Sequence, residues 1–180
     1  MSRWIALFSQ TGAELSEVSS RLGIRPDVIM TNNKDIPILS LKSNAAYKGS
    51  HKALMGMLED MLQEGDVVTL HGYLSILPEN ILNTEGVVFY NGHPALISKY
   101  PELKGLDPQK KTYEDIDNYE FVGCVIHKVV PEIDSGEIVA ETSIPVTEDI
   151  RDLDLEAFIE KLHTLSIDLW VQSLLELLGR

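Results

Sequence analysis

Short runs of apolar residues, separated by segments with helical spacing, recur along the first half of the chain. Strands are predicted where apolar residues predominate over four or five positions, at Trp4–Phe8, Pro26–Met30, Ile38–Leu41 and Val67–Leu70. A further run, Val87–Tyr90, combines β-branched and aromatic residues and predicts a strand buried on both faces. Strands that alternate with helices are typical of a parallel sheet, so the pattern favours one α/β domain over residues 1–180.

Apolar residues at helical spacing predict the helices between and after these strands. The first helix carries Leu15, Val18 and Leu22, the second covers about residues 44–63, and a short one is expected at 78–82. The last helix is predicted to start near Asp152 and to run to about Leu178. Its buried stripe is predicted at Leu155, Phe158, Ile159, Leu162, Leu165 and Leu169.

The segment between the central strand and the last helix has a different pattern. Residues 100–118 are polar, rich in Lys and Asp, and interrupted by Pro and Gly, which predicts a long surface loop. Phe121–Val130 and Ile138–Val146 read as two strands joined by a turn at 131–136. The expected fold is therefore a doubly wound, mostly parallel, Rossmann-like sheet with an antiparallel excursion near the C-terminus.

Composition and charge restrict the classes of partner. The net charge of −13 argues against binding to nucleic acid or to an anionic membrane, because no basic stripe is available to neutralise phosphates. The one cysteine, Cys124, excludes an internal disulfide and a Cys-rich metal site. No apolar run approaches the length of a membrane span, and residues 1–8 lack the pattern of a signal peptide. A cytoplasmic protein is expected.

The most informative residues follow the central strand, in Asn91-Gly92-His93-Pro94. Asn91 and His93 are two positions apart, so on an extended chain their side chains point the same way. Asparagine offers a neutral donor to a developing oxyanion, and histidine exchanges its proton near pH 7. The alternative is structural, because Asn-Gly is a common turn pair and a lone histidine is often a satisfied polar residue.

Other candidate residues lie in turns and at strand ends. Asp134 is either a working carboxylate or an Asx-turn residue, and His127 either orients a catalytic partner or bonds to backbone. The turn Thr11-Gly12-Ala13 either offers backbone N–H groups to an anion or merely caps the first helix. The loop Tyr73–Leu77 suits a flat aromatic ligand, although each of its apolar residues could equally pack in the core.

Four motifs occur in order along the chain: Gly72–Leu77, Asn91-Gly92-His93-Pro94, Gly123–His127, and Asp134 with Gly136. Together they resemble the formyltransferase family, whose Asn-x-His-Pro, Gly-x-(Thr/Ser)-x-His and Asp-x-Gly segments match the last three. Val125 departs from the family pattern at the hydroxyl position. The resemblance covers most of the chain and implies a formyltransferase-like fold.

The family resemblance also implies a reaction, the transfer of a formyl group from 10-formyltetrahydrofolate to a primary amine. By this carry-over Asn91 holds the oxyanion, His93 assists charge stabilisation and proton transfer, and Asp134 handles protons through an ordered water. The pterin ring would be received by Tyr73, Leu74, Ser75, Ile76 and Leu77. The amine substrate would be bound at Thr11, Gly12 and Ala13, and no metal is expected.

The acceptor amine is less well defined than the reaction. Ribonucleotide enzymes of the family carry a Gly-Asn-Gly-Ser-Asn-like phosphate loop, whereas this chain has Ser9-Gln10-Thr11-Gly12-Ala13. Glycinamide ribonucleotide leads as acceptor, with an amino-sugar nucleotide or a non-catalytic folate- or nucleotide-binding role as alternatives. A metal-dependent hydrolase is disfavoured because no His pair has helical ligand spacing. The oligomeric state stays open, with a homodimer as one option.

Overall fold

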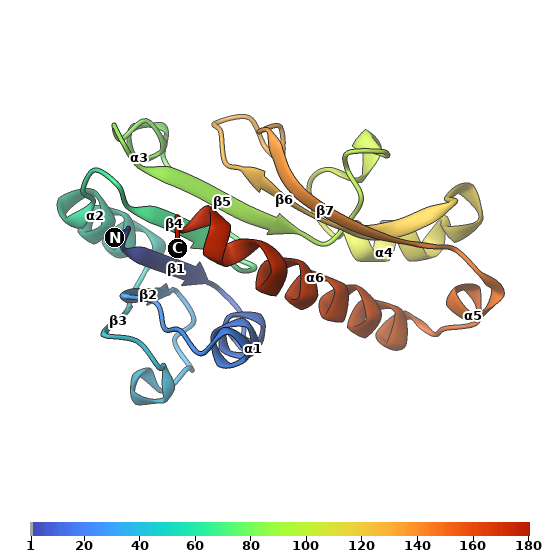
Figure 1. Ribbon diagram of the computed structural model, residues 1–180, viewed down its shortest axis with the longest axis horizontal. Coiled ribbons are helices and arrows are strands. Elements are labelled where there is room, and N and C mark those ends of the chain that lie inside the picture. Colours follow the sequence, from blue (N-terminus) through green and yellow to red (C-terminus); the bar gives the residue numbers. More distant parts are fainter. Residues whose placement is uncertain (1) are drawn as a thin grey trace.

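The computed structural model describes residues 2–180, which form a seven-stranded sheet in the order β3-β2-β1-β4-β5-β6-β7 (Figure 1). The strands β1 to β5 pair in parallel, whereas β5 pairs antiparallel with β6 and β6 with β7. The predicted doubly wound sheet with an antiparallel C-terminal part is confirmed. The strand bounds are β1 Trp4–Phe8, β2 Val28–Thr31, β3 Ala45–Lys48, β4 Val67–Leu70, β5 Val88–His93, β6 Phe121–Lys128 and β7 Ile138–Pro145.

Helices cover both faces of this sheet. One face packs against α1 and the long α6, which crosses β5 and β6, and the other packs against α2 and α3 (Figure 1). The bounds are α1 Ala13–Leu22, α2 His51–Met61, α3 Glu79–Leu82, α4 Pro108–Glu114, α5 Glu148–Arg151 and α6 Leu155–Leu177. Short 3₁₀ turns occur at η1 Ile38–Ser40, η2 Pro101–Leu103 and η3 Ile116–Asn118.

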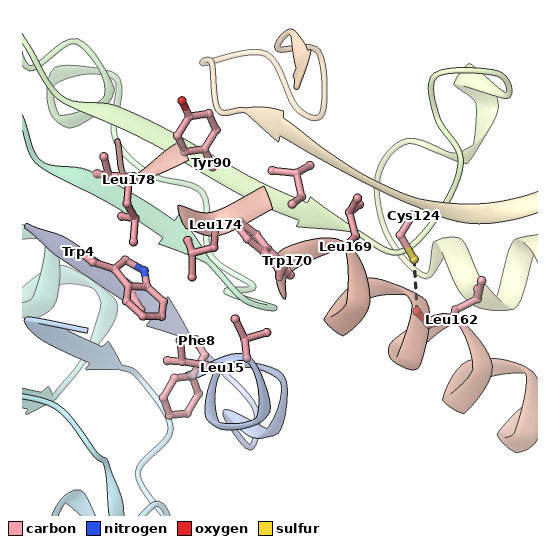
Figure 2. Packing of buried hydrophobic residues seen from close by; sticks show 14 of the residues in the cluster. Trp4, Phe8, Leu15, Tyr90, Cys124, Leu162, Leu169, Trp170, Leu174 and Leu178 are labelled. Atoms are coloured by element: carbon pink, nitrogen blue, oxygen red, sulfur yellow. Dashed lines mark hydrogen bonds between the residues drawn. The ribbon is translucent and has the colours of Figure 1, made fainter. Parts of the chain in front are cut away.

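The core has two layers because side chains alternate along each strand. In β1, Trp4 and Phe8 face the layer under α1 and α6, whereas Ile5 and Leu7 face the layer under α2. Figure 2 shows the first layer, with Trp4, Phe8 and Leu15 on one side and the α6 side chains on the other. The fully buried residues of α6 are Phe158, Leu162, Ser166, Leu169, Trp170 and Leu174. Of the predicted stripe, Leu155, Ile159 and Leu165 are only half-buried.

The third strand was predicted at the wrong place. Ile38–Ser40 forms a 3₁₀ turn, and the strand β3 is Ala45–Lys48, which pairs with β2. The sequence Ala-Ala-Tyr-Lys has little strand character of its own, and its residues are half-buried or exposed. Backbone pairing at the sheet edge therefore defines this strand. As a consequence, α2 begins only at His51. The hydroxyl of the N-cap residue Ser50 accepts from Ala53 N–H at 3.2 Å.

The predicted loop over residues 100–118 was also wrong. It contains η2, α4 and η3, and α4 begins with Pro108 at its first turn. Thr112 is buried, and the Tyr113 ring lies 5.5 Å from the ring of Phe158 on α6. Because only one side of these seven residues touches the core, the apolar spacing is too sparse to predict a helix.

The topology creates a crevice at the carboxyl ends of the neighbouring strands β1 and β4. The chain passes from β1 to β2 and β3 on one side and then returns to β4 and β5 on the other side of β1. Connections that leave a parallel sheet in opposite directions open a space at the carboxyl ends of the two central strands, where α/β sheets bind ligands.

Candidate active site

A cavity of about 570 Å³ lies at the carboxyl ends of β1, β4 and β5. All of the site residues predicted from the sequence line it: Thr11, Gly12, Ala13, Tyr73, Leu74, Ser75, Ile76, Leu77, Asn91, His93 and Asp134. They come from four separate parts of the chain and meet because of the sheet order. Their chemical roles remain predictions, but their location in one cavity is a structural fact.

The pairing of β5 with β6 positions Asn91. In this antiparallel register Asn91 lies directly opposite His127, so both side chains stand on the same face of the sheet. The Asn91 Nδ2 atom is 3.3 Å from His127 Nε2. His127 Nδ1–H donates to the Lys128 carbonyl at 2.8 Å, so a neutral His127 ring accepts from the Asn91 amide. One amide hydrogen of Asn91 is then left to face the cavity.

His93, the last residue of β5, is buried, with 5% of its surface exposed. Its Nε2–H donates to the Leu103 carbonyl at 3.0 Å, because a carbonyl can only accept. The Nδ1 atom then faces Asp134 Oδ2 at 3.4 Å. Burial lowers the pKa of His93 below its ordinary value, and the carboxylate of Asp134 offsets this only in part. The ring is therefore neutral at pH 7 and keeps its free lone pair next to a carboxylate.

Asp134 sits in the turn between β6 and β7 and joins the two histidines. Its second oxygen, Oδ1, is 3.4 Å from His127 Nε2, and its Oδ2 also accepts from Gly105 N–H at 2.9 Å. Burial raises the pKa of Asp134, but the neighbouring imidazoles of His127 and His93 and the bond from Gly105 N–H together hold it below its ordinary value. The carboxylate is thus ionised and already held in place.

The backbone of this turn needs unusual geometry. Asp134 adopts φ of 51°, a left-handed conformation that Asp and Asn tolerate better than most residues. Two residues later, a Cβ on Gly136 would lie 1.7 Å from the Lys128 carbonyl oxygen. The Asp-x-Gly spacing therefore lets the turn fold back against the end of β6, next to His127.

The loop after β4 is split between core and cavity. Tyr73 and Leu77 are buried in the core layer under α2, and the Tyr73 hydroxyl lies 2.8 Å from His51 Nδ1. Burial raises the pKa of Tyr73 to about 12. Leu74 and Ile76, in contrast, are each 67% exposed. Under the pterin prediction, Tyr73 and Leu77 anchor the loop while the residues between them contact the ring.

Sequence reasoning missed a second polar cluster in the same cavity. Glu14, on the first turn of α1, accepts from His71 Nδ1–H at 2.9 Å and from the Ser166 hydroxyl of α6 at 2.7 Å. His71 Nε2 contacts Thr69 Oγ1 at 2.9 Å, and its ring lies 4.5 Å from the ring of Trp170. None of these residues belongs to a recognisable motif, and the only sequence signal was the acid that follows the Gly12 turn.

A family model described as "Formyl transferase" matches residues 26–174, which include Asn91, His93, His127 and Asp134. The chain belongs to the formyl transferase family. The family resemblance read from the four motifs is confirmed. The match also includes the loop after β4 and most of α6, so the cavity lies within the matched region except for its lining residues 10–14.

Two relatives show how this formyl transferase compares in sequence. A phosphoribosylglycinamide formyltransferase from Dictyostelium discoideum is 30% identical over 103 residues, covering 54% of this chain and 48% of the relative. A methionyl-tRNA formyltransferase from Thermotoga maritima is 33% identical over 116 residues, covering 58% of this chain and 36% of the relative. The aligned part of the chain thus spans about half or less of these relatives.

The fold comparison covers the formyl transferase chain more fully. The crystal structure of a phosphoribosylglycinamide formyltransferase from Campylobacter jejuni has a TM-score of 0.78 and 25% identity, covering 98% of this chain and 97% of that one. This likeness supports the formyltransferase-like fold expected from the sequence. Within residues 2–180, no group of three or more His, Cys, Asp or Glu side chains is placed to hold a metal ion. Over the same residues, no helix is long and apolar enough to span a bilayer.

Proposed function

We propose that this protein transfers the formyl group of 10-formyltetrahydrofolate to a primary amine. The observation that carries the proposal is the convergence of Asn91, His93 and Asp134 on one cavity of a formyl transferase fold. Glycinamide ribonucleotide is the first acceptor to test, because relatives of both sequence and structure are phosphoribosylglycinamide formyltransferases. Both partners under this proposal are small molecules, and a cytoplasmic location and a homodimer stay predictions.

The first step of the proposed reaction creates two charges. The amine nitrogen attacks the formyl carbon, a C–N bond forms, and the carbonyl electron pair moves to oxygen. The free amide hydrogen of Asn91 donates to this oxyanion, while the contact with His127 keeps the amide oriented. Stabilisation of this kind by a fixed donor contributes about 3–4 kcal/mol to catalysis.

The second step moves a proton from the attacking nitrogen to the leaving one. The ammonium nitrogen loses a proton, and the His93–Asp134 pair is built to hold it, because Nδ1 has its lone pair directed at the carboxylate. Both residues line the cavity, so an ordered water held there beside Asp134 would relay the proton from the amine. The electron pair of the oxyanion then re-forms the carbonyl, the bond from carbon to N10 of the folate breaks, and N10 takes up the proton.

The proposal is tested by incubating the purified protein with 10-formyltetrahydrofolate and a panel of primary amines, led by glycinamide ribonucleotide. Tetrahydrofolate release is followed by absorbance, and the formylated product by mass spectrometry. We expect Asn91→Ala to lower kcat by about 10²–10³-fold, the effect of losing one oxyanion donor. Asn80→Ala, on the exposed surface of α3, is the matched control and should leave kcat unchanged. Unaltered turnover in Asn91→Ala, or no turnover with any amine, would refute the proposal.

A further inference from the structure

Glu14 places a carboxylate at the end of the cavity where the chain turns from β1 into α1. Its side chain is only 16% exposed, and that exposed part lines the cavity. Burial alone would raise the pKa of Glu14, but the bond and the charge of His71, the Ser166 hydroxyl and the charge of His163 hold it below its ordinary value. Glu14 is therefore a fixed negative charge.

The hydrogen bonds of Glu14 leave it able to bind a ligand. An ionised carboxylate has about four acceptor positions, and His71 and Ser166 occupy one on each oxygen. At least one remaining position on each oxygen is free, and the cavity provides the open side. A ligand group that donates a hydrogen bond, such as a hydroxyl or an ammonium, fits this position. A phosphate, which offers only acceptors and negative charge, does not.

The charged side chains that line the cavity also favour a ligand without a phosphate at this end. Among the residues of the described chain that line the cavity, carboxylates such as Glu14 and Asp134 occur, but there is no lysine or arginine. Phosphate sites in proteins commonly use these permanently charged side chains, often in bidentate contact. The side chains that bond to the Glu14 carboxylate are the imidazole of His71 and the hydroxyl of Ser166, and neither is permanently charged.

The position of Glu14 relative to the reacting groups suggests which ligand it meets. β1, which leads into α1, is separated from β5 by β4 alone, and Leu70 at the end of β4 pairs with Asn91. Neighbouring strands are about 4.8 Å apart, so the end of β1, from which the chain turns into α1 and Glu14, lies roughly 10 Å from the row of Asn91 and His93 across the sheet. This is the distance from a reacting amine to the far end of a sugar-sized acceptor.

We propose that Glu14 is the specificity-determining residue for the acceptor, selecting amines that present hydroxyl or ammonium groups at the start of α1 and disfavouring a phosphate there. This inference rests on the proposed formyl transfer and names the chemical class of its acceptor. Under it, a phosphate on the acceptor makes no favourable contact at α1, so the unphosphorylated form of an accepted amine is at least as good a substrate as its phosphate ester.

The test compares two pairs of amines that differ only by a phosphate: glycinamide ribonucleotide with its riboside, and glucosamine 6-phosphate with glucosamine. For each, kcat/KM is measured with 10-formyltetrahydrofolate, and binding is measured by calorimetry. In the wild-type protein we expect the unphosphorylated member of at least one pair to react and bind at least as well as its phosphorylated partner. In Glu14→Gln, which removes the charge, the preference should shift at least tenfold toward the phosphate ester.

The control is Glu17→Gln, the same change on the exposed side of α1, which should leave the preference within twofold of wild type. If Glu14→Gln does not fold, as judged by thermal unfolding, the wild-type preference still decides. A tenfold or greater preference for both phosphate esters, no binding of any of the four amines, or an unchanged preference in folded Glu14→Gln would overturn the role of Glu14. Absence of turnover despite binding would instead count against the proposed formyl transfer.

Discussion

Replacing Asp134 by Asn tests whether the carboxylate stabilises a proton on His93. Asparagine keeps the shape, tolerates the φ of 51° and can still accept from Gly105 N–H, so the fold should persist. At the 3.4 Å separation of Nδ1 and Oδ2, an ion pair is worth about 5 kcal/mol at an effective dielectric constant of about 20. Part of this is realised only when His93 becomes charged. We expect kcat to fall by about 10²–10⁴-fold, in the range of general acid–base catalysis.

The assay is the pH dependence of kcat/KM, followed by tetrahydrofolate release. Asp134 raises the pKa of His93 against the effect of burial, so its removal should shift the ionisation of His93 to still lower pH. Asp107→Asn is the matched control, because Asp107 also has φ of 51° and lines the cavity but is exposed. Its activity should stay within about twofold of wild type, since surface changes of this kind have small effects. Equal losses in both variants would refute the reasoning.

Three further perturbations test the packing behind the site. Gly136→Ala would place its Cβ 1.7 Å from the Lys128 carbonyl, so activity and Tm should fall, whereas Gly56→Ala on α2, with open space around it, should not lower Tm. Gly92→Ala would bring a Cβ within 2.7 Å of Trp170 Nε1 and should cost about 1–3 kcal/mol in urea unfolding. Burial raises the pKa of the Cys124 thiol, which donates to the Leu162 carbonyl (Figure 2), so iodoacetamide should label it only after unfolding. An unchanged Tm in Gly136→Ala, an unchanged free energy of unfolding in Gly92→Ala, or rapid labelling of the native protein would contradict these expectations.

Acid unfolding provides a check on the ionised state of Asp134. Its pKa in the folded protein lies below the ordinary value, so the ionised form adds stability at higher pH that is lost as pH falls through the folded pKa. The difference in free energy of unfolding between wild type and Asp134→Asn should therefore shrink as the solution is acidified below the ordinary pKa of an aspartate. Denaturant unfolding at several pH values measures it, and a difference that grows on acidification would contradict the assigned charge.

The sequence predicted the central parts of this molecule well because their signals are local. Val87–Tyr90 is apolar on both faces, and Pro94 marks the point where β5 stops pairing. The placement of Asn91 and His93 on one side of the chain follows from strand geometry alone. Asp134 was identifiable as a candidate from its turn, but its meeting with His93 depends on the β6–β7 hairpin, which brings the turn back to the end of β5.

The failures share a different physical cause. β3 exists because its backbone pairs with β2, and α4 exists because one of its sides packs on α6, so neither has a strong pattern of its own. The cluster of Glu14, His71 and Ser166 joins side chains separated by 57 and 152 positions. Nothing in the immediate neighbourhood of these residues indicates the contact. Only the order of strands places α1, the end of β4 and α6 around one space.

The residues proposed for formyl transfer and the residue proposed to choose the acceptor are held by different parts of the structure. Asn91, His93 and Asp134 are fixed by the register of β5 with β6 and by a turn that a single glycine allows. The far end of the cavity is built from α1, the residue after β4 and a helix turn of α6, none of which takes part in that register. Under the proposal, a change of charge at Glu14 would alter the choice of acceptor while the β5–β6 register that holds Asn91 and His93 stays the same. The named relatives include a phosphoribosylglycinamide formyltransferase and a methionyl-tRNA formyltransferase, and the proposed role of Glu14 offers one electrostatic basis for such a difference in acceptor.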